Sequence, residues 1–140
     1  MQASVPSGLI EKYADKIRMG VMIFNDDGSA SECSAPDASI LYDCSESDNR
    51  DGGNIISDIG QSEDHTNDLI AVINDIKATS WTPLAESIYN AIGYYTQNAA
   101  LRLDTADFTM NDPITAWCQN NNILVITEGA STADLNNSVS

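Results

Sequence analysis

Two short, uninterrupted apolar runs constrain the fold of this chain more than any other feature. The first is Gly20–Phe24 and the second is Asn122–Thr127. Neither approaches the roughly 18 residues that span a bilayer, so no membrane span is expected. Strands that are apolar on both sides are typical of a parallel sheet that is covered on both faces. We therefore expect both runs to be central strands of one sheet, lying close together and parallel.

Helical periodicity surrounds these runs. We expect one helix from near Leu9, capped by Ser7, a second from near Thr66, and a third opening at Thr82-Pro83, with Thr82 as the N-cap. A short strand is expected over Ile55–Ile59. The side chains expected to face the core are Leu9, Ile10, Tyr13, Ala14 and Ile17 in the first helix, Leu69, Ile70, Ile73 and Ile76 in the second, and Leu84, Ile88, Ala91, Ile92 and Tyr95 in the third.

The order helix, strand, strand, helix, helix, strand predicts an α/β fold with a mostly parallel sheet and helices on both faces. A length of 140 residues suits a single domain, 1–140. Residues 29–53 are expected to form a loop insertion and residues 98–113 a polar insertion, with Phe108 as its possible anchor. A short helical turn is expected around Ile114–Cys118.

The formal net charge is −15, from 21 acidic and 6 basic residues. Such a surface repels phosphate backbones, so nucleic acid is not expected as a partner. It suits divalent cations, a cationic partner or a salty extracellular setting, and a plain role in solubility is the alternative.

The three cysteines bear on whether the chain is found in an oxidising or a reducing cellular compartment. Cys33 and Cys44 bracket a polar loop, and a disulfide between them would imply an oxidising compartment. Cys118 is then expected to stay unpaired within this chain. The alternative is three reduced thiols in the cytosol. With one histidine and no C-x-x-C pair, a structural zinc site is not expected.

Two segments carry a resemblance to a known family: Thr82-Pro-Leu-Ala-Glu-Ser87 and Ile123-Leu-Val-Ile-Thr-Glu-Gly-Ala-Ser131. Together with Leu9–Phe24 and Asp112–Gln119, they resemble the von Willebrand factor A-type (vWA) domain, and most closely the vWA domains of tip adhesin and assembly proteins of bacterial type IV pili. The resemblance implies a vWA/Rossmann-like fold, incomplete at the N-terminus. It also implies an extracellular, cell-surface location, with a signal peptide outside this chain.

In that family a threonine at a helix start and an acid after a buried strand join an upstream Asp-x-Ser-x-Ser motif to hold a divalent ion. The positions that match here are Thr82 and Glu128, as ligands of Mg²⁺ or Ca²⁺, which prefer oxygen donors. For Thr82 the alternative is a plain helix N-cap. For Glu128, where the family has Asp, the alternative is an ordinary strand-end turn.

The chain departs from the family at its front end, because it begins at the helix instead of the strand that carries the upstream motif. A literal match, Asp43-Cys44-Ser45-Glu46-Ser47, follows the first helix and strand, so we interpret it as loop. Metal binding is therefore expected to be weak or absent in this truncated chain.

No catalytic motif accompanies these features. His65, the only histidine, has no evident catalytic partner and is expected on the surface, before a helix. The sequence thus favours a binding or adhesion module, assisted by a divalent cation in the parent protein, whose partner is a protein or surface ligand such as pilus subunits. The alternatives are a structural domain with a lapsed metal site and, least favoured, an enzyme.

Overall fold

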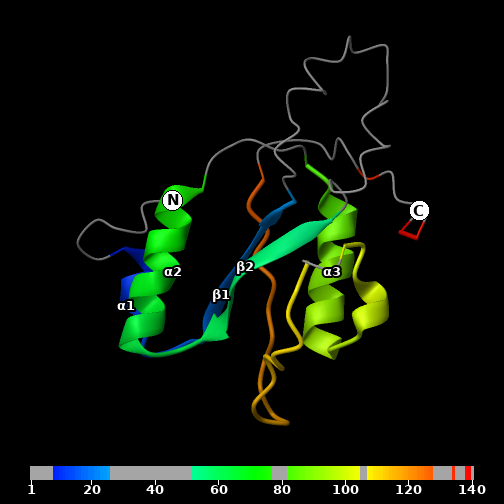
Figure 1. Cartoon of the computed structure of the whole chain (residues 1–140). Helices are drawn as coiled ribbons and strands as arrows, with labels where there is room; N and C mark the ends of the chain where they lie inside the picture. Colours follow the sequence, from blue (N-terminus) through cyan, green and yellow to red (C-terminus); the bar gives the residue numbers. More distant parts are fainter. Residues whose placement is uncertain are drawn as a thin grey trace.

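The computed structural model describes residues 8–25, 52–76, 82–104, 107–127, 134 and 138–139. Their elements follow in the order α1 (Leu9–Tyr13), β1 (Met19–Phe24), β2 (Gly53–Gly60), α2 (Glu63–Asp75), α3 (Leu84–Thr96) and the 3₁₀ turn η2 (Ala99–Leu101). In Figure 1 the pair β1–β2 occupies the middle, with α1 and α2 together on one side and α3 with η2 on the other.

The two strands form an antiparallel pair, in which Val21 lies opposite Ser57 and Met22 opposite Ile55. The register shifts twice between Met19 and Met22. In the described residues these strands are the whole sheet. The prediction of a mostly parallel, vWA/Rossmann-like sheet is therefore wrong. An apolar run shows that a strand is buried, but parallel and antiparallel pairing both bury apolar side chains, so the run does not fix the direction of the neighbour.

The run at Ile123–Ile126 does not form the predicted central strand. These residues lie in no helix or strand and are exposed, and Leu124 keeps 76% of its surface accessible. The sheet of the described residues consists of β1 and β2 alone, so this run pairs with neither strand.

α1 begins at Leu9 as predicted but ends at Tyr13, before Ile17, whose predicted core position is wrong because it is exposed. The second helix begins earlier than the predicted start near Thr66. α2 starts at Glu63 because Ser62 Oγ accepts the main-chain N–H of His65 at 3.0 Å, and Glu63 and Asp64 favour the positive end of the helix dipole. α3 begins at Leu84 with Pro83 at the N-cap position, one residue later than predicted. It ends at Thr96, and the left-handed backbone of the C-cap Gln97 (φ 52°) lets the N–H of Gln97 reach the last carbonyls of the helix.

The apolar core lies between α1, α2 and β1. Ile10 and Leu69 are buried in it, and Met19, Val21, Ile70 and Ile73 pack around them. His65 is not a free surface residue, because its Nε2 lies 2.8 Å from the carbonyl oxygen of Met19 and so ties α2 to β1.

α3 packs with the opposite face from the one predicted. Its buried residues are Glu86, Ser87, Asn90, Gly93 and Tyr94. The expected core positions Ile88 and Ile92 are exposed; 47% of the Ile92 surface is accessible. Hydrophobic periodicity found the apolar stripe, but in the described residues the polar stripe is the one that meets the rest of the fold.

Candidate functional site

The buried face of α3 is held by a polar network. Asn90 Oδ1 accepts the N–H of Gly53 at 2.8 Å, and Asn90 Nδ2 donates to Leu101 O and to Asp107 Oδ2. Glu86 Oε2 accepts the N–H of Gly52 at 2.9 Å. Glu86, Asn90 and Asp107 have no accessible surface. The network therefore joins α3 to the start of β2 and to the 102–108 loop.

Asp107 is the most constrained acid of this network. Its Oδ2 accepts three hydrogen bonds, from Asn90 Nδ2 and from the N–H groups of Leu103 and Asp104, whereas Oδ1 has no partner among the described residues. Burial raises the pKa of this carboxyl to about 6, against the opposing effect of those donors. Phe108 follows it into the interior and packs edge-on against Tyr94, so the predicted anchor of the polar insertion is confirmed.

Thr82 lies directly before α3 and is half-buried, and its carbonyl oxygen accepts the N–H of Leu84 at 2.9 Å. Glu128 lies outside the described residues, as do Cys33, Cys44 and the Asp43–Ser47 match. Among the described residues no three His, Cys, Asp or Glu side chains gather where they could hold a metal ion. Thr82 alone offers one oxygen, whereas Mg²⁺ takes about six, so we assign no chemistry to a metal here.

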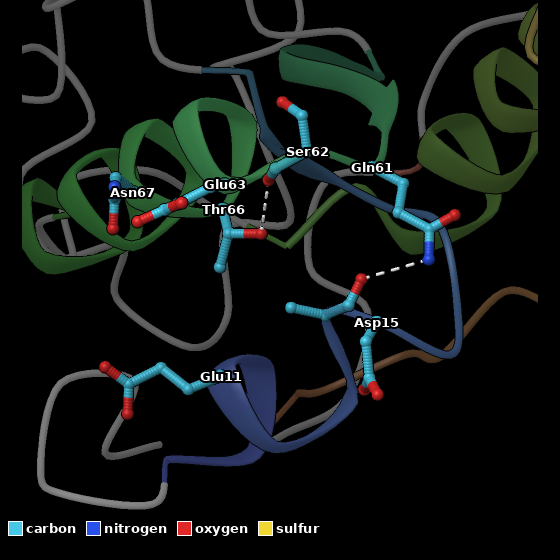
Figure 2. A pocket seen from close by; sticks show the side chains of 8 residues that line it. Glu11, Asp15, Gln61, Ser62, Glu63, Thr66 and Asn67 are labelled. Atoms are coloured by element: carbon cyan, nitrogen blue, oxygen red, sulfur yellow. Dashed lines mark hydrogen bonds between the residues drawn. The ribbon is translucent and has the colours of Figure 1, made fainter.

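A shallow depression of about 390 Å³ lies between α1 and the start of α2. Glu11 and Asp15 extend from the α1 side and Glu63 from α2, while Gln61 Nε2 donates to the carbonyl of Ala14 across one end (Figure 2). The three acids spread apart around the rim instead of converging on a point (Figure 2). This arrangement is that of a solvated acidic surface.

A second surface is apolar, and we call it the 113–127 surface. Residues 113–127 carry no charged side chain, in a chain of net charge −15. The segment exposes Ile114, Trp117, Ile123, Leu124, Val125 and Ile126, and Trp117 is 97% accessible. Apolar patches of this kind on a soluble protein are typical of interaction sites. Cys118, beside Trp117, is an exposed free thiol among the described residues.

Arg18 anchors this surface to the strand pair. Its Nη1 donates to the carbonyl of Pro113 at 2.7 Å and to Thr115 Oγ1 and Gln119 Oε1, and its Nη2 donates to the carbonyl of Ile59. Gln119 in turn donates to Pro113 O, and its N–H bonds Ala116 O in a turn at the predicted helical turn. The segment that precedes the exposed run is thus fixed beside the start of β1.

The apolar stripe of α3 borders the same surface. Tyr95 donates from its hydroxyl to the carbonyl of Asn122 at 3.3 Å, so α3 and the 113–127 surface meet at this point. Ile88, Ile92 and Tyr95 share one face of α3, since they are spaced by four and three residues. Their helical spacing predicts a core position, whereas Ile88 and Ile92 are exposed. The signal that separates the two cases is the uncharged stretch from 113 to 127, in contrast to the acidic remainder.

Comparison with protein-family models, with curated proteins and with solved structures gives no significant match to this chain. The resemblance to vWA domains therefore rests on the quoted residues alone. Within the described ranges no helix is long and apolar enough to cross a membrane.

Proposed function

We propose that this chain is a protein-binding module that engages its partner through the 113–127 surface. The observation that carries the proposal is the exposed, uncharged apolar segment in a strongly acidic chain. Burying such a surface against a partner removes apolar side chains from water, and this contributes a favourable free energy of about 25 cal/mol per Å² of apolar surface buried. The nearly complete exposure of Trp117 adds to the argument, because tryptophan is among the residues that most often dominate binding energy.

The cellular setting and the cation belong to the proposal only through the resemblance. A vWA-like adhesion role would place the chain at a bacterial cell surface or pilus, with Thr82 and Glu128 contributing to a divalent-ion site. The alternative is a structural domain in a larger assembly, with no working metal site. Both roles need a protein partner, and neither uses a catalytic group.

A peptide selection with matched variants tests the proposal. A phage-displayed library of random peptides is selected on the immobilised chain, and the affinity of the selected peptides is measured by fluorescence anisotropy. We expect Leu124→Glu to weaken binding by about tenfold or more, since it places a charge in the apolar surface.

Leu9→Glu is the matched control, because Leu9 is also an exposed leucine (55% accessible) but lies on α1. It should leave the affinity unchanged. Equal affinity of wild type and Leu124→Glu would show that the 113–127 surface is not the binding site.

A further inference from the structure

The two edges of the strand pair differ. Main-chain donors of β2 are covered from its outer side: the N–H of Ile55 donates to Asp107 O at 2.8 Å, and the N–H of Ile59 donates to Tyr94 Oη at 3.0 Å. Burial raises the pKa of Tyr94 to about 12, so its phenol keeps its proton and stays a neutral partner. A strand whose outer donors are taken in this way cannot accept another strand.

The outer edge of β1 has no such cover in the described part of the chain. Among the described residues β1 pairs only with β2, and the one further hydrogen bond to its main chain joins His65 Nε2 to Met19 O, at the start of the strand. The edge from Gly20 to Phe24 is therefore open for main-chain pairing. It carries no charged residue, which is the device that commonly protects an exposed edge.

Within the described part of the chain, the main-chain groups of the run Ile123–Ile126 are unpaired as well. Its residues make no hydrogen bond with any other described residue, although Ile and Val are strong strand formers. Arg18 holds the preceding segment beside the start of β1, and Tyr95 holds Asn122 beside α3. Figure 1 shows the chain after these two anchors as an extended trace that passes the strand pair.

The unpaired main-chain groups of β1 and of Ile123–Ile126 indicate which kind of partner segment could bind between them. A helix satisfies its own main-chain groups and would leave those of β1 and Ile123–Ile126 unmet, whereas an extended strand pairs with them. Its side chains must be apolar to meet Leu124 and Ile92, and basic residues at its ends suit a chain of net charge −15. A second copy of the chain is opposed by the repulsion between two such charges.

We infer that an apolar, extended segment of a partner polypeptide, with basic residues at its ends, adds as a β-strand to the open edge of β1 and is covered by Ile123–Ile126 and the apolar stripe of α3. The inference rests on the proposed function and specifies its binding mode. Strand addition gives affinity through main-chain hydrogen bonds, and the side chains of alternate residues give specificity.

A synthetic peptide tests this mode. The probe is about six alternating valine and threonine residues, flanked by lysines and carrying a fluorophore, which matches a common strand length. Its partner probe has the same sequence with alternate amides N-methylated, so that one edge loses its donors while the side chains stay. Binding is measured by fluorescence anisotropy at low salt. We expect the unmodified peptide to bind. The N-methylated peptide, which lacks the donors of one edge, should bind about tenfold or more weakly.

A protein variant gives the second arm. Val125→Pro removes an N–H that makes no hydrogen bond with other described residues, so the fold should be retained, which circular dichroism checks. Val125→Pro should weaken binding of the unmodified peptide by about tenfold. The control is Leu9→Glu, at an exposed position on α1, which should bind the peptide as the wild type does.

The outcomes separate the binding mode from the proposed function. Equal binding of all peptides, or no binding, overturns strand addition, whereas the proposed function is judged by whether library peptides lose affinity for Leu124→Glu. A dimer of the chain in sedimentation equilibrium that Val125→Pro abolishes would also overturn the inference, because the occupant would then be a second copy.

Discussion

Asn90 Nδ2 donates to Asp107 Oδ2 at 2.8 Å, and both residues are completely buried. The same amide also accepts from Gly53, so one side chain connects α3, the start of β2 and the 102–108 loop. A buried polar group is costly to leave without a partner, and this makes the network sensitive to single substitutions.

Asn90→Ala should lower the free energy of unfolding by about 3 kcal/mol, because it leaves the N–H of Gly53 without an acceptor, removes one of the donors to Asp107 Oδ2 and opens a cavity. Urea unfolding followed by circular dichroism measures the change. Asn67→Ala, at an exposed position of α2, is the control and should change it by less than about 0.5 kcal/mol. Similar values for both variants would contradict the structural role of Asn90.

Asp107 predicts a pH dependence of stability. Its pKa is raised from 3.8 to about 6 in the folded state, so the folded chain binds this proton more tightly than the unfolded chain. The stabilisation is therefore fully present below the unfolded pKa and is lost as the pH rises through about 6. Asp107→Asn should remove this pH-dependent part of the unfolding free energy, which we expect to fall by roughly 2 kcal/mol in the wild type between about pH 4 and pH 7.

The measurement is the free energy of unfolding of wild type and Asp107→Asn across that pH range. Asp68→Asn removes the same charge from an exposed position on α2 and should keep the wild-type slope. A slope that is the same in Asp107→Asn and wild type would refute the assignment.

Gly52 is required by its backbone and by its neighbour. Its φ is +75°, and a Cβ at this position would overlap Oδ1 of Asn90. Gly52→Ala should therefore cost at least about 3 kcal/mol of unfolding free energy. In the double variant with Asn90→Ala the overlap is gone, so the combined cost should be smaller than the sum of the two single costs. Additive costs would show that Gly52 and Asn90 do not interact.

A metal titration addresses the cation part of the proposal. Among the described residues Thr82 is the only one of the two predicted ligands, so we expect weak or no saturable heat when Mg²⁺ alone is titrated into the chain. Calorimetry measures this for wild type and for Thr82→Ala, with CaCl₂ as a second titrant. Tight binding that Thr82→Ala abolishes would establish a site at the start of α3, while tight binding that survives the substitution would place it elsewhere.

Local features of the fold could be predicted from the sequence. The apolar spacing of Leu69, Ile70 and Ile73 indicates α2. The apolar run Gly20–Phe24 indicates β1, and Phe108 in a polar segment indicates an anchor. Each depends on interactions within a few residues, or on burial of one large side chain, and a linear pattern records both.

The direction of pairing and the choice of buried faces were decided only by the tertiary structure. Val21 meets Ser57 across an antiparallel pair, a contact between residues far apart in the sequence that no apolar run specifies. α3 buries Asn90 instead of Ile92 because the main chain of β2 and the carboxyl of Asp107 supply hydrogen-bond partners on that side. The sequence determined that Ile92 and Leu124 are apolar. Their exposure was decided by the tertiary structure, in which no third strand of the described residues pairs with β1 to cover them.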